Sequence, residues 1–253
     1  MLTGLVQRIA ELAFPPCCLL CRNGGESPVS SFCSDCTGML DQERRTPACP
    51  RCAATIAEYE PTRADCMDCR GRSLRVDAVV RVGTYAGATG RLLRRYKFGG
   101  RLELAKILGG YLYEVVICTP WNTRIEAVVP VPTHWRRRLL RRSDYPAGVL
   151  ARAVAADMDL PLVQMLRRVH LRAHQIGLPY TERFVNVRGA FAVRPGIRLH
   201  KARLLLVDDV RTSGATLDEC ARVLRKAGAA EVYGAVVARV SDAQPGSASL
   251  ATA

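Results

Sequence analysis

Eleven cysteines occur in this chain of 253 residues, and eight of them form four C-x-x-C pairs near its beginning. The pairs are Cys18/Cys21, Cys33/Cys36, Cys49/Cys52 and Cys66/Cys69. A tetrahedral Zn²⁺ takes four thiolates, and two C-x-x-C turns supply that number. Eleven residues separate the first two pairs and thirteen the last two, which suits a small hairpin in each case. Sequential grouping therefore predicts two Cys₄ zinc sites, with a crossed grouping of the pairs as the alternative.

Both zinc ions are expected to be structural, because four thiolates leave no coordination position for a catalytic water. Disulfides are disfavoured in a reducing cytosol. A thioredoxin-like redox role needs a βαβ pattern around the cysteine pair, and these pairs lack one. Cys118 and Cys220 fall in helical contexts, so we expect both to be buried as small hydrophobic residues.

A second segment with chemical character, residues 204–216, reads Leu-Leu-Leu-Val-Asp-Asp-Val-Arg-Thr-Ser-Gly-Ala-Thr. Its four branched apolar residues predict a buried parallel strand, so Asp208 and Asp209 fall where open α/β sheets bind ligands. The small-residue turn leads into a helix that begins near Thr216, and backbone N–H groups at such a junction bind anions. It is not a Walker loop, because no Gly-Lys-Ser/Thr is present. The segment predicts a ligand that carries both a phosphate and vicinal hydroxyls.

Alternating strand and helix patterns after residue 74 must position these groups. The predicted strands are Val76–Tyr85, Ala127–Val131, Leu204–Val207 and Val232–Ala238, and the predicted helices are Gly90–Arg95, Leu102–Val116, Ala147–Ala156 and Thr216–Ala227. This order predicts an α/β fold, with a mostly parallel sheet covered by helices on both faces. Residues 17–72 instead carry many turn residues and few long apolar runs, so metal binding is expected to supply their stability.

We expect four parts along the chain. They are a short amphipathic helix in residues 1–16, a double zinc ribbon in 17–72, the α/β domain in 76–240 and a disordered tail in 241–253. No run of eighteen apolar residues occurs, so no membrane insertion is expected. The N-terminal stretch lacks the uninterrupted apolar centre of a signal peptide, and we expect a cytoplasmic protein.

The balance of 37 basic and 23 acidic residues gives a net charge of +14, which favours a polyanionic partner. Five arginines cluster just beyond a predicted strand end: Arg136, Arg137, Arg138, Arg141 and Arg142. Together with Lys97 they predict a site for pyrophosphate or for nucleic acid. Trp135 adds an aromatic ring on which a base of single-stranded DNA can stack. The alternative for each basic cluster is a solvated face.

In the order of its motifs, the chain resembles the ComF/GntX family of double-zinc-ribbon, phosphoribosyltransferase-like proteins. Residues 204–216 resemble the 5-phosphoribosyl-1-pyrophosphate (PRPP) motif of type I phosphoribosyltransferases. Three further segments resemble family stretches: Tyr96–Arg101 (K-F-x-G-R), Val129–His134 (V-P-V-P-x-H) and Gln175–Phe191 (Q-x-G-L, then E-R-x-x-N-V-x-G-A-F). The chain departs from the family at Arg141–Pro146, which reads R-R-S-D-Y-P where R-G-F-N-Q is usual. If that turn positions pyrophosphate or the acceptor, its change weakens or abolishes turnover.

The resemblance implies a type I phosphoribosyltransferase-like parallel sheet preceded by a small zinc-ribbon module. It also implies that Asp208 and Asp209 hold the ribose 2′- and 3′-hydroxyls of PRPP, directly or through Mg²⁺. The residues that would wrap the 5′-phosphate are Val210, Arg211, Thr212, Ser213, Gly214, Ala215 and Thr216. One interpretation is a phosphoribosyltransferase acting on an unknown nitrogen acceptor. The other is a non-catalytic PRPP-binding, single-stranded-DNA-binding protein that works with competence or DNA-processing proteins in DNA uptake during natural transformation.

Overall fold

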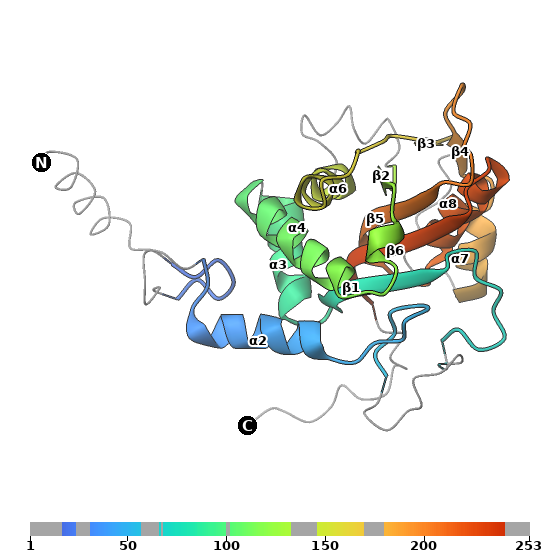
Figure 1. Ribbon diagram of the computed structural model, residues 1–253. Coiled ribbons are helices and arrows are strands. Elements are labelled where there is room, and N and C mark those ends of the chain that lie inside the picture. The colour runs from blue at the N-terminus through green and yellow to red at the C-terminus, as the bar shows by residue number, and fades with distance from the viewer. Residues whose placement is uncertain are drawn as a thin grey trace, which may run out of the picture.

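A four-stranded parallel sheet forms the centre of the computed structural model (Figure 1), which describes residues 17–23, 31–56, 66, 68–99, 102–132, 146–169 and 180–240. Its strands are β1 (Ala78–Thr84), β2 (Ala127–Pro130), β5 (Arg203–Arg211) and β6 (Glu231–Arg239). They lie in the order β1-β6-β5-β2, and every neighbouring pair is parallel. The carboxyl ends of these strands therefore meet at one edge of the sheet.

Helices cover both faces of this sheet (Figure 1). One face packs against α3 (Ala88–Gly99), α4 (Leu102–Ile117) and α6 (Pro146–Asp157). The other packs against α7 (Tyr180–Val187), α8 (Ala215–Lys226) and the antiparallel hairpin of β3 (Leu166–Arg168) and β4 (Phe191–Val193). A short 3₁₀ helix, η1 (Asn122–Arg124), precedes β2. None of the helices within the described ranges combines the length and the hydropathy that crossing a membrane requires.

Strand β5 shows why the sheet needs cover on both sides. Leu205 and Val207 belong to the core beneath α3, α4 and α6, whereas Leu204 and Leu206 belong to the core beneath α8. All four side chains are fully buried. Burial of each such side chain contributes about 1.5–3 kcal/mol. An unbroken run of branched apolar residues is typical of a parallel strand that is buried on both faces.

Predicted and observed elements agree for the four long strands and for α3, α4, α6 and α8, and the expected parallel sheet with helices on both faces is confirmed. Helix α2 (Ser34–Arg45), the β3–β4 hairpin and α7 were not predicted. Strand β5 continues four residues beyond its predicted end at Val207, because these residues still pair with β6. The predicted N-terminal helix and C-terminal tail lie outside the described residues, and the domain boundaries stay predictions.

The cysteine-rich segment packs along β1, the edge strand of the sheet, with α2 lying beside it (Figure 1). The backbone N–H of Val79 in β1 donates to the carbonyl of Pro50 at 3.2 Å. Leu20 and Leu40 join the core beneath α3, and Ala53 joins the core on the other face. The cysteine-rich segment therefore shares hydrophobic cores with the sheet instead of forming a separate body.

Candidate functional site

Two groups of four cysteine thiols come together in the cysteine-rich segment. The first consists of Cys18, Cys21, Cys33 and Cys36, and the second of Cys49, Cys52, Cys66 and Cys69, with the sulfurs of each group within 4.8 Å of one another. The grouping is sequential, and the crossed alternative is wrong. Zinc–sulfur bonds of about 2.3 Å in a tetrahedron place the sulfurs roughly 3.8 Å apart. The Cys21 and Cys33 sulfurs are 3.8 Å apart and the Cys49 and Cys69 sulfurs 3.9 Å, as a tetrahedral ion requires. The Cys66 sulfur lies closer to those of Cys52 and Cys69, at 3.3 and 3.2 Å. Each group is compact enough to surround one ion.

Local hydrogen bonds favour the ionised form of one sulfur in each group. The backbone N–H groups of Leu20 and Cys21 donate to Cys18 Sγ at 3.3 and 3.5 Å. Burial raises the pKa of Cys18, but hydrogen bonds from backbone amides outweigh it and lower the pKa to about 6. For Cys49 the largest cause is the hydrogen bond with the Cys52 thiol, and the pKa falls to about 4. Thiolate is the form in which cysteine binds metal ions.

Strand β5, a short turn and helix α8 build the predicted phosphate loop. Pairing with β2 ends at Val207, opposite Pro130, so the last residues of β5 pair only with β6 among the described strands. The turn closes at Gly214, whose φ of +85° lies in the left-handed region. This backbone conformation favours glycine, and a Cβ at this position would also lie 2.5 Å from the Arg211 guanidinium, which would have to move. Helix α8 begins at the next residue, and its first N–H groups point toward the turn.

Side chains in this loop differ in exposure. Arg211, Ser213 and Ala215 are buried, whereas Thr212 and Thr216 are half-buried. The backbone N–H of Ala215 donates to Ser213 Oγ at 3.4 Å, so the Ser213 hydroxyl stabilises the loop itself. The hydroxyls of Thr212 and Thr216 are therefore the loop's better exposed side-chain donors.

Asp208 and Asp209 lie in the last four residues of β5, and their carboxyl groups have different surroundings. The backbone N–H of Asp209 donates to Asp208 Oδ1 at 2.8 Å. Burial, followed by the charge of Asp209, raises the pKa of Asp208 well above its ordinary value. Lys97 Nζ, near the C-terminus of α3, lies 2.6 Å from Asp209 Oδ2. The structure thus unites Lys97 with both predicted acids.

The predicted arginine cluster (Arg136, Arg137, Arg138, Arg141 and Arg142) and Trp135 lie outside the described residues. The described residues on either side of this segment lie near the acids. Val131 donates its N–H to the carbonyl of Val207 at 3.0 Å. The carbonyl of Pro146, at the start of α6, accepts from the hydroxyl of Tyr96, the neighbour of Lys97, at 3.1 Å.

One contact was not predicted from the sequence, and one prediction about a cysteine is wrong. Glu43 of α2 accepts hydrogen bonds from the turn between β1 and α3, and nothing in the local pattern of α2 marks that contact. Cys220 is buried on α8 as expected, but the expectation for Cys118 is wrong because it is exposed. Helix α4 ends at Ile117, and the following turn places Cys118 at the surface.

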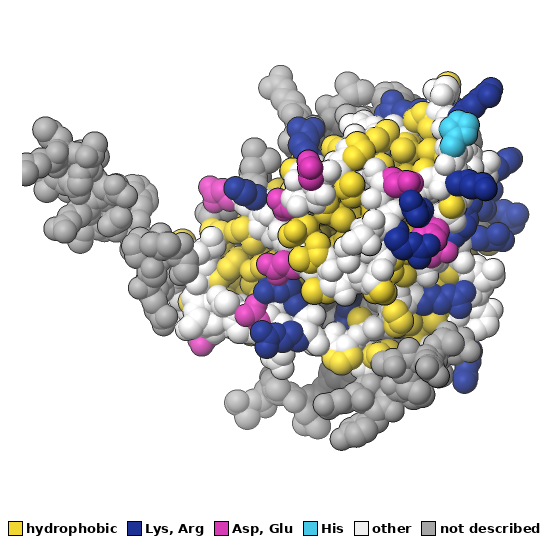
Figure 2. All heavy atoms as spheres, viewed as in Figure 1, with side chains coloured by type: hydrophobic (Ala, Val, Ile, Leu, Met, Phe, Trp, Pro, Cys, Tyr) yellow, Lys and Arg dark blue, Asp and Glu magenta, His cyan; other side chains and the backbone are white. Residues whose placement is uncertain are grey.

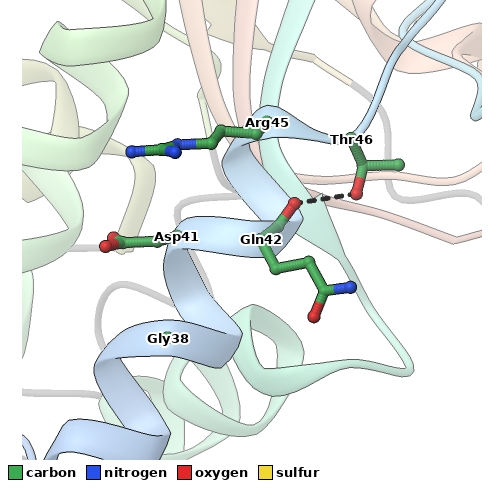
Figure 3. Close-up of a pocket in the computed structure, with 5 residues that line it drawn as sticks. All are labelled: Gly38, Asp41, Gln42, Arg45 and Thr46. Atoms are coloured by element: carbon green, nitrogen blue, oxygen red, sulfur yellow. Dashed lines mark hydrogen bonds between the residues drawn. The ribbon is translucent and has the colours of Figure 1, made fainter.

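A hollow on α2 is separate from the phosphate loop and contains no predicted site residue. It is lined by Gly38, Asp41, Gln42, Arg45 and Thr46 (Figure 3). The Thr46 hydroxyl donates to the Gln42 carbonyl at 2.9 Å, which closes the C-terminal turn of the helix. Gly38, Gln42 and Arg45 are exposed, so the hollow lies on the solvent side of α2.

Basic side chains gather at one end of the molecular face in Figure 2, over α8 and the connection between β4 and β5. Arg194, Arg198 and Lys201 in that connection are exposed. Acidic side chains are interspersed elsewhere on the same face. The excess of positive charge is therefore visible on the described surface as well as in the composition.

The chain is similar to proteins named for competence and DNA utilization. It is 29% identical over 220 residues to Competence protein F of Haemophilus influenzae, covering 85% of this chain and 93% of that protein. It is 30% identical over 229 residues to DNA utilization protein YhgH of Salmonella typhimurium, covering 87% and 96%. Among solved structures, glutamine PRPP amidotransferase from B. subtilis matches with a TM-score of 0.38 and 20% identity, covering 57% of this chain and 30% of that one. No protein-family model matches the chain.

Proposed function

The chain belongs to the ComF/GntX family, and from this premise we propose that its β5–α8 loop binds PRPP. One observation carries the proposal: two acids at the end of β5 lie next to a glycine turn that opens α8, and backbone N–H groups at such a junction can bind an anion. Asp208 and Asp209 would hold the ribose hydroxyls, directly or through Mg²⁺, while residues 210–216 surround the 5′-phosphate. A single ligand with both a phosphate and vicinal hydroxyls accounts for the two kinds of group.

Lys97 and the arginines of residues 136–142 would bind the pyrophosphate of the same ligand. Pyrophosphate is highly charged and needs cationic partners. Lys97 lies 2.6 Å from Asp209, so a cation is already present beside the acids that would hold the ribose. Mg²⁺ prefers carboxylate and phosphate oxygens, and both classes of ligand would be present at this edge of the sheet.

We further propose that a nitrogen acceptor attacks C1 of the ribose. The new N–C1 bond forms as the bond between C1 and the pyrophosphate oxygen breaks, and pyrophosphate leaves with the electron pair of that bond. The chain's residues would contribute positioning of the ribose and stabilisation of the negative charge on the leaving group. No covalent bond between the chain and the substrate is needed.

Both Cys₄ groups would hold structural Zn²⁺. The four sulfurs of each group lie within 4.8 Å of one another, which suits a tetrathiolate ion. In the first group, backbone N–H groups also donate to Cys18 Sγ. All four ligands come from the chain, so the metal would stabilise the fold and take no part in transfer. Metal binding would order a segment whose sequence offers few apolar residues.

A ³¹P NMR titration of Mg²⁺-PRPP with the full chain tests the proposal. Shifted PRPP resonances indicate binding, and a new pyrophosphate resonance on adding a nitrogen acceptor indicates turnover. In calorimetry, the double variant Asp208→Asn/Asp209→Asn should bind PRPP about tenfold more weakly or worse, because it loses both charged anchors. Equal affinity of the wild type and this variant would contradict the assignment of the acids.

A second candidate function is binding of single-stranded DNA. The net charge of +14 and the names of the relatives, Competence protein F and DNA utilization protein YhgH, favour it. PRPP would then act as a ligand of a DNA-uptake protein and not as a substrate. Release of pyrophosphate separates the two functions, because only the transferase produces it.

A further inference from the structure

The carboxylate of Glu43, in the last turn of α2, reaches into the turn between β1 and α3. Three backbone N–H groups donate to it, those of Thr84 at 3.3 Å, Ala88 at 2.5 Å and Thr89 at 3.2 Å. Ala88 and Thr89 are the first two residues of α3, where the helix dipole favours a negative charge. Glu43 therefore caps α3 from a helix that belongs to the cysteine-rich segment.

The turn is shaped to receive this carboxylate. A Cβ at Gly83 or at Gly87 would overlap an oxygen of Glu43, so both positions require glycine while the contact is made. The Thr89 hydroxyl beside it is fully buried and makes no hydrogen bond within the described residues. The Arg81 guanidinium is also buried. Burial and the charge of Arg239 lower its pKa, and the negative charge of Glu43 opposes them.

The other end of α3 holds the ligand-site lysine. Lys97 pairs with Asp209 at 2.6 Å, two residues before α3 ends at Gly99. Arg95, on the same helix, donates at 2.6 Å to the carbonyl of Leu19, the residue that follows Cys18 of the first cysteine group. A continuous helix of twelve residues transmits a change of position at one end to the other, because its backbone hydrogen bonds hold it rigid.

We propose that Glu43 is a positioning residue for the acid pair: by capping α3 it sets where Lys97 meets Asp209. This inference rests on the proposed PRPP-binding function of that pair. Cys36 and Glu43 lie on the same helix, α2. The contact of Glu43 with the N-terminus of α3 therefore also connects the first cysteine group to the ligand site. The cysteine-rich segment then tunes ligand affinity in addition to covering the edge of the sheet.

A double-mutant cycle between Glu43 and Lys97 tests the inference, with zinc-loaded full chain and Mg²⁺-PRPP in calorimetry. Glu43→Gln removes the charge that the three amides bind, and we expect affinity to fall about 3- to 30-fold. If Glu43 acts through Lys97, Glu43→Gln has no further effect in a Lys97→Met background. A general loss of stability would not produce this non-additivity. Lys97→Gln, which also removes the charge that pairs with Asp209, replaces Lys97→Met if the latter binds too weakly to measure.

Two further variants ensure that the test does not depend on Glu43→Gln alone. Gly87→Ala places a methyl group where Glu43 sits and should lower PRPP affinity as Glu43→Gln does. Glu126→Gln is the matched control, because it removes an exposed ion pair with Arg203 at the opposite edge of the sheet and should leave affinity unchanged. Zinc content and thermal unfolding of every variant are measured alongside, so a variant that fails to fold is recognised.

The outcomes separate the two proposals. Additive effects of Glu43→Gln and Lys97→Met, or unchanged affinity in Glu43→Gln and Gly87→Ala, would overturn the positioning role while PRPP binding stands. A wild-type chain that does not bind PRPP would overturn the proposed function, and the inference with it. Non-additive loss of affinity, with the Glu126→Gln control unaffected, is the result that we expect.

Discussion

Asp208 and Asp209 are adjacent in sequence but have opposite electrostatic surroundings. Asp208 is half-buried, and the loss of solvent around its carboxyl group, followed by the charge of Asp209, raises its pKa well above the ordinary value. Asp209 instead meets Lys97. Strongly shifted carboxyl groups concentrate at functional sites, because burial and like charges cost stability unless a ligand or a cation uses them. The difference between these residues favours a site that gains a cation or hydroxyl donors when its ligand binds.

The raised pKa of Asp208 predicts how stability changes with pH. The folded chain holds this proton more tightly than the unfolded chain, in which the pKa of Asp is about 3.9. Stability therefore falls as pH rises from about 4 through the raised pKa. Asp208→Asn does not ionise and keeps the oxygen that accepts from the Asp209 amide. Its Tm should exceed that of the wild type near pH 8, with the difference shrinking toward pH 4.

Scanning calorimetry over this pH range checks the prediction. Asp157→Asn, at an exposed acid at the end of α6, is the control and should show no such trend. An Asp208→Asn variant that is less stable than the wild type at every pH would contradict the assignment of Asp208 as a destabilised acid. The same variant should lose PRPP affinity, which is the trade-off expected of a functional residue.

At the residue scale, local patterns predicted the two acids and Lys97 as site residues, but not the ion pair between Lys97 and Asp209. The position of two carboxylates that follow a branched apolar run can be predicted, because the run forms a buried parallel strand and the acids fall at its carboxyl end. The Lys97–Asp209 pair joins residues from α3 and β5, and Glu43 reaches α3 from α2. Those contacts depend on how helices pack on the sheet, and no spacing within one segment encodes them.

Gly214 forms the turn between β5 and α8, which is the proposed anion-binding turn. Its left-handed backbone costs any other L-residue about 1–2 kcal/mol, and a methyl group there would also meet the Arg211 guanidinium. Gly214→Ala should destabilise the fold by at least that amount and weaken PRPP binding further. Gly110→Ala is the matched control, because its Cβ meets nothing within 4 Å inside α4. It should raise stability by about 0.5–1 kcal/mol and leave PRPP affinity unchanged.

Urea unfolding and PRPP titration of both variants measure these effects. If Gly214→Ala loses stability but binds PRPP as the wild type does, the turn does not contact the phosphate. If both alanine variants behave alike, the special backbone of Gly214 is not needed. Either result would remove the β5–α8 turn from the proposed site.

The two metal centres should respond separately to mutation. Elemental analysis of the wild type should give about two zinc ions per chain, and Cys36→Ser should give about one. Cys36 is also part of the core beneath α3, so its loss should lower Tm markedly. Cys220→Ser is the control, because this buried cysteine belongs to neither group. This variant should keep both zinc ions. The proposal of two zinc centres would be contradicted if the wild type contained a single ion, or iron in place of zinc.

Elements whose apolar residues recur at regular spacing were predicted. Elements that depend on contacts with other parts of the chain were not. Helix α4 presents Leu104, Leu108 and Leu112 at regular spacing to the core, so its pattern is readable. Helix α2 buries only Cys36 and Leu40, and its stability comes from the cysteine group and the sheet edge. The strands β3 and β4 have three residues each, too few for an alternating pattern. Their pairing is a tertiary feature.

At the scale of the whole molecule, shared packing joins the cysteine-rich segment to the proposed ligand site. Leu20 and Leu40, from the first cysteine group and α2, lie in the same core as Leu92 and Leu93 of α3. Helix α3 in turn carries Lys97 to Asp209. If the first cysteine group holds a metal ion and Lys97 serves a ligand, as we propose, loss of that ion should disturb α3 and with it the ligand site. The cysteine-rich segment and the sheet therefore form one packed unit.

The net charge of +14 favours binding of single-stranded DNA by the whole molecule. We propose that the basic cluster of residues 136–142, beside Trp135, makes this contact. Affinity for single-stranded DNA should fall steeply as salt rises, because phosphate contacts release counterions. Arg137→Glu/Arg141→Glu should weaken binding to all sequences alike, and Trp135→Ala should cost about 1–3 kcal/mol if a base stacks there. Fluorescence anisotropy measures these changes.

Arg194→Glu/Arg198→Glu is the control, since it changes net charge equally at exposed positions between β4 and β5. Equal weakening in both double variants would mean that overall charge, and not the cluster, attracts DNA. If the Arg137→Glu/Arg141→Glu variant loses PRPP affinity in calorimetry while DNA affinity is unchanged, the cluster serves pyrophosphate instead.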